Sequence, residues 1–134
     1  MKRAMERGRA KSLNLKPLAL LRSHSFVGVD PKKFGLSPVK AINWALEVAK
    51  LKLGDIELNE AFAAQYLGCE RELGLNRELT NVNGSGVGLG HPVGSTGCRI
   101  MVTLLHAMKK RGKTLGMATL CGGGVSMATV LEMC

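Results

Sequence analysis

One stretch near the C-terminus, residues 115–133, reads LGMATLCGGGVSMATVLEM. Two runs of apolar and β-branched residues flank Gly122, Gly123 and Gly124 in this stretch. Such runs are typical of β-strands, and glycines between them allow a tight turn, so the stretch predicts an antiparallel hairpin. The sheet to which it belongs is therefore expected to be at least partly antiparallel.

Upstream of the hairpin, segments typical of strands and helices alternate. The run LALLRSHSFVGV, residues 18–29, predicts a strand, and DIEL, residues 55–58, predicts a second, very short one. Between them, Ser37 is expected to cap a helix with Pro38 at its first position, and apolar residues recur at helical spacing at Val39, Ile42, Leu46 and Ala49. Alternation followed by a hairpin predicts an α/β domain with a mixed sheet.

Three further helices complete this outline. Asn59 is the expected cap of a helix that carries an apolar stripe and ends at Gly74, the stripe being Phe62, Tyr66, Cys69 and Leu73. The run CRIMVTLLHAMKKRG, residues 98–112, predicts a well-buried helix with a basic last turn before its final glycine. Residues 4–13 predict the end of a helix that Gly8 interrupts and that cannot continue past Pro17.

Length and charge limit the range of functions. The chain has 134 residues, which suits a single domain over residues 1–134 that includes a basic partial helix at 1–13. Residues 1–33 hold nine Lys and Arg against two acidic residues, out of a net charge of +9. This arm could attract nucleic acid, an anionic membrane or an anionic metabolite, but it carries no aromatic residue before Phe26 for base stacking. A solvated helix face is the favoured interpretation, with no nucleic-acid partner.

The four cysteines are widely spaced, contain no C-x-x-C pair and follow no secretory leader. They predict reduced thiols in a cytoplasmic protein. Because no apolar run approaches about 18 residues, we expect no membrane association either.

Three short motifs stand at the ends of predicted elements: NEAFA from Asn59, GHPVGSTG around His91, and CGGG from Cys121. Each residue alone has an ordinary structural explanation, namely a helix cap, a turn histidine and a small buried thiol. A zinc site built from His91, Cys121, Cys98 and His106 lacks ligand-like spacing, so we expect no metal.

In this order and at these separations, the motifs resemble the C-terminal half of a thiolase. The resemblance covers nearly the whole chain and rests on VGVDP, SPVKAIN, NEAFAAQ, NVNGSG, LGHPVGSTGCRI and TLLHAMKKRG. It implies an α/β domain with a mixed sheet and helices on both faces. It also implies acyl exchange on coenzyme A thioesters by a covalent, two-step route, with acyl-CoA as substrate and no separate cofactor.

The resemblance assigns a role to each motif residue. His91 matches the histidine that activates the nucleophile and helps to bind the thioester oxygen, and Asn59 matches the asparagine that holds a water in the same oxyanion hole. Cys121 matches the acid/base at the α-carbon of the acyl group. If the site is intact, the Gly122–Gly124 N–H groups and a nearby imidazole are expected to lower the pKa of this thiol. If a missing residue has turned the hairpin, the thiol is expected to face apolar packing instead.

The chain departs from the family pattern at three places. The nucleophilic cysteine belongs to an N-terminal half that nothing in this sequence matches, so that half or a second copy is the expected partner. The run before Asn59 is a few residues short, and one residue is missing between Cys121 and the three glycines. The chain is therefore expected to be the C-terminal half of an acyltransferase, catalytically incomplete alone. The alternatives are a non-catalytic acyl-CoA or subunit-binding module, an inactive relic and, least favoured, a basic nucleic-acid binder.

Overall fold

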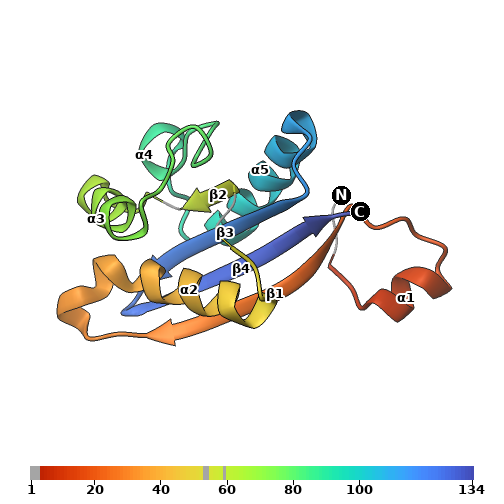
Figure 1. Ribbon diagram of the computed structural model, residues 1–134, viewed down its shortest axis with the longest axis horizontal. Coiled ribbons are helices and arrows are strands. Elements are labelled where there is room, and N and C mark those ends of the chain that lie inside the picture. The colour runs from red at the N-terminus through yellow and green to blue at the C-terminus, as the bar shows by residue number, and fades with distance from the viewer. Residues whose placement is uncertain (1–3, 53–54, 59) are drawn as a thin grey trace.

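A four-stranded mixed sheet forms the centre of the computed structural model, which describes residues 4–52, 55–58 and 60–134 (Figure 1). The strands are β1 (Ala19–Gly28), β2 (Asp55–Leu58), β3 (Leu115–Gly122) and β4 (Val125–Met133), in the order β1-β4-β3-β2. β4 pairs antiparallel with both β1 and β3, and β2 pairs parallel with β3. The predicted strands, hairpin and mixed sheet are confirmed.

Helices cover both faces of the sheet, as expected. Alternation along the strands separates two cores, since Met117 of β3 packs toward α2 (Ser37–Ala49) whereas its neighbour Ala118 packs toward α5 (Thr96–Arg111). The α2 core also takes in α3 (Ala63–Leu73) through the fully buried Cys69. The α5 core is centred on three helix residues, Ile100, Leu104 and Met108. The His91 loop therefore leads into a helix that the sheet holds in place.

The start of α2 differs from the prediction. A 3-10 helix, η1 (Pro31–Leu36), runs directly into α2, so Ser37 is the first residue of the helix and not its cap. The Ser37 hydroxyl lies 2.6 Å from the Ser126 hydroxyl of β4, in the core. The prediction of a Ser37 cap is wrong because the preceding 3-10 helix continues into α2. The Ser37 hydroxyl instead donates to the Phe34 carbonyl at 2.5 Å and contacts Ser126, 89 residues away in sequence.

The other helices follow the sequence with small shifts. α3 begins at Ala63, with Phe62 as its extended N-cap residue, so the expected cap of this helix at Asn59 is wrong. The helix ends at the left-handed Gly74. α5 likewise ends at Gly112, at a φ of 64°. α1 (Arg7–Ser12) contains Gly8 within the helix, so the expected interruption there is wrong.

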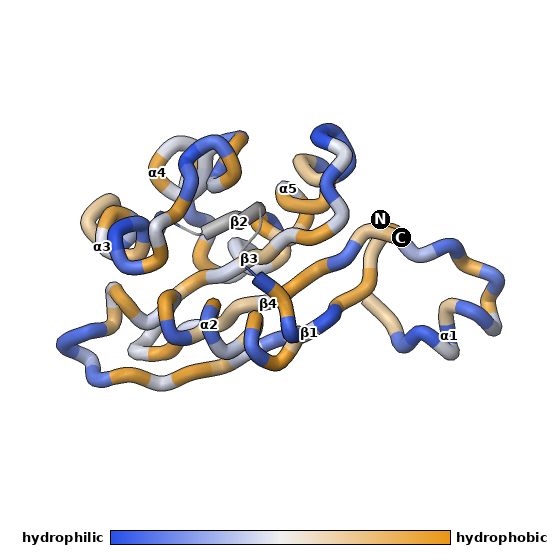
Figure 2. The backbone as a smooth tube through the Cα atoms, in the orientation of Figure 1, coloured by the Kyte–Doolittle hydropathy of each residue, from blue (hydrophilic) through white to orange (hydrophobic). Residues whose placement is uncertain are grey.

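α1 stands apart from the sheet, and it has no buried residue (Figure 1). Its sequence is mostly hydrophilic (Figure 2). α1 is thus exposed, which agrees with a solvated helix but leaves the choice between that interpretation and an anionic partner a prediction. A separate observation concerns length and hydropathy: none of the described helices is long and apolar enough to cross a membrane.

The hairpin turn between β3 and β4 consists of only two of the three glycines. Gly122 pairs with Val125 in the ladder, which leaves Gly123 and Gly124 as the turn. Both have positive φ values, 59° and 81°. Two central residues with positive φ define the type I′ turn, whose twist suits a β-hairpin.

Candidate functional site

His91 lies in the loop between the short helix α4 (Gly86–Leu89) and α5. Gly90 precedes it at a φ of 92°, a conformation that side chains other than glycine rarely adopt. After it, a turn closes through the Ser95 N–H, which donates to the Pro92 carbonyl at 2.7 Å. The ring of His91 is exposed, and its Nδ1 lies 2.7 Å from Oγ1 of Thr96, the first residue of α5.

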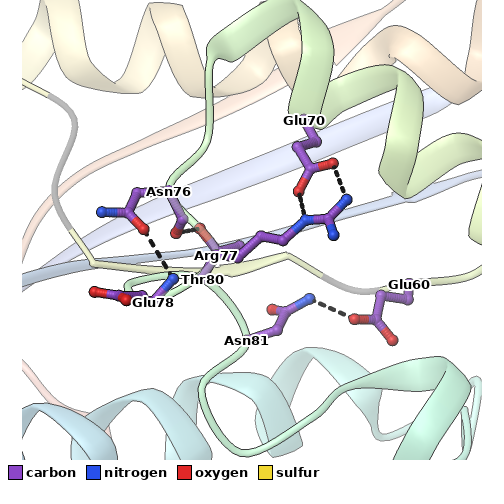
Figure 3. A network of polar contacts seen from close by, with 7 residues as sticks. All are labelled: Glu60, Glu70, Asn76, Arg77, Glu78, Thr80 and Asn81. Atoms are coloured by element: carbon purple, nitrogen blue, oxygen red, sulfur yellow. Dashed lines mark hydrogen bonds and ion pairs between the residues drawn. The ribbon is translucent and has the colours of Figure 1, made fainter.

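Glu60 connects this loop to the segment that follows β2. One carboxylate oxygen accepts from the Asn81 amide at 2.8 Å, and the other accepts from the backbone N–H of Val87 at 3.1 Å (Figure 3 shows the first contact). Val87 belongs to α4, four residues before His91. The Glu60 carboxylate therefore links the residue after Asn59 to the loop that carries the imidazole.

A second contact fixes the chain between α3 and this loop. The Arg77 guanidinium donates two hydrogen bonds to the Glu70 carboxylate, which lowers the pKa of Glu70 (Figure 3). Asn76 accepts from the Glu78 N–H in the same turn. This pair and the Glu60 contacts together hold residues 76–87 against α3 and the segment after β2.

Cys121 lies inside β3, paired with Ser126 of β4. The residue is 6% exposed, and burial is the largest cause that raises the pKa of its thiol, while its own backbone N–H lowers the value by less. The expected lowering of this pKa by a glycine turn and an imidazole is wrong, because the thiol lies within the sheet and not at the turn. Burial also raises the pKa of Cys69, where Cys121 is one of the minor influences.

Asn59 lies outside the described residues, so its predicted role stays a prediction. The structure attaches its neighbour Glu60 to the His91 loop, a contact that sequence patterns did not indicate. Its partners, Asn81 and Val87, follow 21 and 27 residues later, and no local pattern indicates such a contact. Within the described residues, no group of three or more His, Cys, Asp or Glu side chains could hold a metal ion.

One face of the sheet carries exposed apolar side chains where α5 does not cover it. We call this the open sheet face, and it consists of Leu21, Phe26 and Met127. Phe26 pairs with Met127 across β1 and β4, and an irregularity between Leu21 and Ser23 turns Leu21 to the same side as its partner Leu131. These three side chains are 43–58% exposed. These exposed side chains are apolar surface that a partner could cover.

A family model described as the thiolase C-terminal domain matches residues 15–133. The acetyl-CoA acetyltransferase of Escherichia coli K12 is 52% identical over 132 residues, which cover 96% of this chain and 34% of that protein. The 3-ketoacyl-CoA thiolase of Bacillus subtilis 168 is 47% identical over 134 residues, covering 97% of this chain and 34% of that protein.

The solved structures that are similar to this chain belong to proteins with the same two names. The acetyl-CoA acetyltransferase of Bacillus anthracis superimposes with a TM-score of 0.92 at 51% identity, over 97% of this chain and 34% of that one. Human mitochondrial 3-ketoacyl-CoA thiolase, solved in complex with CoA, gives 0.92 at 39% identity, over 96% and 34%. The chain thus spans about a third of the length of the proteins it matches. Nearly all of its residues, including all those of the sheet and of the His91 loop, fall within the matched segment, and the chain therefore belongs to the thiolase C-terminal domain family.

Proposed function

We propose that this chain works as the C-terminal half of an acyltransferase acting on acyl-CoA thioesters, together with an N-terminal half that supplies the nucleophilic cysteine. The observation that carries the proposal is the exposed His91 imidazole, held at the start of α5 through Nδ1 and tied by Glu60 to the segment after Asn59. The names of the relatives, acetyl-CoA acetyltransferase and 3-ketoacyl-CoA thiolase, support the substrate class.

In the proposed reaction, His91 acts through Nε2, the ring nitrogen that points away from Thr96. Because Nδ1 is engaged by Thr96, Nε2 is the nitrogen that faces a reacting group. There it would take the proton of the nucleophilic thiol as the resulting thiolate attacks the thioester carbonyl. The protonated ring would then donate to the oxygen on which negative charge develops, beside the water that Asn59 is proposed to hold.

Cys121 is assigned the proton transfer at the α-carbon of the acyl group. One observation favours the alternative, a non-catalytic acyl-CoA or subunit-binding module or an inactive relic: the thiol is buried and its pKa is raised. A buried neutral thiol is a weak base. The two candidates therefore differ in whether Cys121 reaches a bound acyl group.

The open sheet face supports a partner. Leu21, Phe26 and Met127 leave an apolar surface that the N-terminal half, or a second copy of this chain, would cover. The four free thiols of the chain favour a reducing, cytoplasmic setting for the complex.

The test is an acetoacetyl-CoA thiolysis assay with and without an N-terminal half. The purified chain alone is expected to give no turnover, because the base is present without its nucleophile. Adding the part of the Escherichia coli acetyl-CoA acetyltransferase that this chain does not match supplies the missing half. Turnover is expected from that mixture.

Two variants assign any turnover to the proposed site. His91→Ala is expected to lower the rate by about 10²–10⁴-fold, the contribution of a positioned acid/base group. His106→Gln, which alters an exposed imidazole on α5, serves as the matched control. Coenzyme A that raises the melting temperature of an inactive mixture would instead support the binding module, and turnover that survives His91→Ala would remove the proposed role of that residue.

A further inference from the structure

Thr96 links the imidazole of His91 to the backbone of the same loop. Its Oγ1 lies 2.7 Å from His91 Nδ1 and 3.1 Å from the carbonyl oxygen of Pro92. Thr96 is 1% exposed, so its hydroxyl is shielded from water. The imidazole itself is exposed, and this buried hydroxyl is the group that holds its inner edge.

The number of available hydrogens decides which atom donates and which accepts in each of these two hydrogen bonds. A threonine hydroxyl has one hydrogen, and a carbonyl oxygen can only accept. If Thr96 donated to Nδ1, its oxygen would face the Pro92 oxygen at 3.1 Å with no hydrogen between them. Both contacts are hydrogen bonds only if His91 Nδ1–H donates to Thr96 Oγ1 and the Thr96 hydroxyl donates to the Pro92 carbonyl.

We propose that Thr96 is a positioning residue that keeps neutral His91 in the tautomer with its hydrogen on Nδ1. The lone pair of the neutral ring is then on Nε2, the outward nitrogen. Its catalytic meaning rests on the proposed function, since a base that takes a proton at Nε2 must have that nitrogen unprotonated beforehand.

The same arrangement serves the protonated ring. When Nε2 gains a proton, Nδ1–H still donates to Thr96, and Thr96 still donates to Pro92. The ring therefore does not rotate between accepting a proton and donating a hydrogen bond to the developing oxyanion. A donor that needs no rearrangement during the reaction is the property that makes such sites effective.

Nitrogen-15 NMR of the chain, with its imidazoles labelled, reads the tautomer directly. The spectrum is recorded at a pH where the rings are neutral. His91 is expected to show a pyridine-type resonance at Nε2 and a pyrrole-type resonance at Nδ1. His24, an exposed histidine on β1, provides the internal reference for an imidazole in solvent. A neutral His91 with its hydrogen mainly on Nε2 overturns the proposal without any variant.

Two variants test the part played by the hydroxyl. Thr96→Val keeps the shape of the side chain and removes the hydroxyl, so the pyridine-type resonance is expected to shift from Nε2 toward Nδ1. Thr96→Ser keeps the hydroxyl and is expected to retain the wild-type pattern. An unchanged tautomer in folded Thr96→Val, or its loss in folded Thr96→Ser, would contradict the assignment.

The tautomer can be measured in a chain that catalyses nothing. Absence of thiolysis in the reconstituted mixture, with the hydrogen still on Nδ1, would reject the proposed function and leave the role of Thr96 intact. Thiolysis that depends on His91, with the hydrogen on Nε2, would support the proposed function and reject the role of Thr96.

Discussion

The loop of His91 and the hairpin of Cys121 carry the two acid/base residues that the thiolase resemblance implies, but the fold treats them differently. His91 is exposed and held at one nitrogen by a buried hydroxyl, which leaves the other nitrogen available. Cys121 is 6% exposed, sits in a strand ladder, and has a raised pKa. The loop thus leaves its imidazole at the surface, whereas the hairpin packs its thiol into the domain.

The reason for this difference lies in how each group is placed. The His91 loop is fixed by polar contacts from Thr96 and Glu60, which tolerate an exposed side chain between them. The hairpin is fixed by its ladder, in which every residue points to one face or the other. A hydrogen-bonded loop can therefore keep a polar group accessible, and a strand residue remains accessible only if its face of the sheet is uncovered.

The largest expected effect is on the labelling of Cys121. At pH 7, iodoacetamide should modify Cys121 on the order of a hundredfold more slowly than the exposed Cys134, because labelling requires a local opening and a thiolate that burial disfavours. A time course with each cysteine resolved by peptide mass measures both rates.

A one-residue insertion sharpens that comparison. Placing one residue, a valine, between Cys121 and Gly122 restores the spacing that the thiolase resemblance implies, and it should raise the labelling rate of Cys121 toward that of Cys134. Fast labelling of Cys121 in the unaltered chain would show that its thiol is already accessible. Cys121 and His91 would then not differ in accessibility.

The next effect concerns the open sheet face. Phe26→Ser should raise the dissociation constant of any self-association by roughly tenfold or more, since burying a phenylalanine side chain contributes about 1.5–3 kcal/mol. Sedimentation equilibrium measures the change. Val48→Ser is the matched control, because Val48 is similarly exposed, at 57% against 58%, but lies on α2. Equal effects of both variants would mean that association does not use this face.

Removing the charge of Glu60 tests how the His91 loop is held. Glu60→Gln should lower the free energy of unfolding by about 1–2 kcal/mol, because an amide cannot accept at both positions that the carboxylate uses. Urea unfolding gives the stability, and hydrogen exchange at the Val87 amide reports the local loss. Glu78→Gln, at an exposed carboxylate nearby, should stay within about 0.5 kcal/mol of the parent. Unchanged protection of Val87 in Glu60→Gln would exclude this contact as a fastening of the loop.

The smallest effect is the pH dependence that the buried thiol brings to stability. The folded-state pKa of Cys121 is raised, so above its ordinary value of 9.0 the unfolded chain loses this proton more readily than the folded chain. The stabilisation is complete below that pH and is lost as the pH rises, by at most about 1.4 kcal/mol per pH unit. The decrease in unfolding free energy with pH should be less steep in Cys121→Ala than in the parent chain. Cys69 and Tyr66, whose pKa values are also raised, contribute equally to both proteins, so their contribution is removed when the two slopes are subtracted. Identical slopes would mean that Cys121 titrates normally.

The sequence predicts the fold well where local pattern and tertiary packing agree. Alternation identifies β3 and β4, and the glycines after Leu73 and Arg111 mark the helix ends, because each depends on residues close in sequence. Ser37 fails as a predicted cap because a 3-10 helix runs into α2 before it, and its hydroxyl also contacts Ser126 on a distant strand. Local pattern cannot report such a contact.

The candidate site follows the same rule. His91 can be found from its motif, and the glycine before it has the positive φ that such a loop needs. Glu60 and Thr96 could not be assigned, because their roles arise from hydrogen bonds whose geometry depends on the folded loop. The burial of Cys121 likewise depends on which residue ends the strand. The three consecutive glycines do not show whether the strand ends before or after Gly122, which in the structure is its last paired residue.

The two-residue turn at Gly123 and Gly124 also has an evolutionary consequence. The ladder runs without a break from Leu115 paired with Glu132 to Gly122 paired with Val125, so a shorter turn leaves every core pair of the hairpin intact. Both turn residues are glycines at positive φ, and the conformation costs them little. A change in the number of glycines here is therefore expected to alter the stability of the hairpin little. If Cys121 has the proposed chemistry, its distance from the turn would be selected separately from stability.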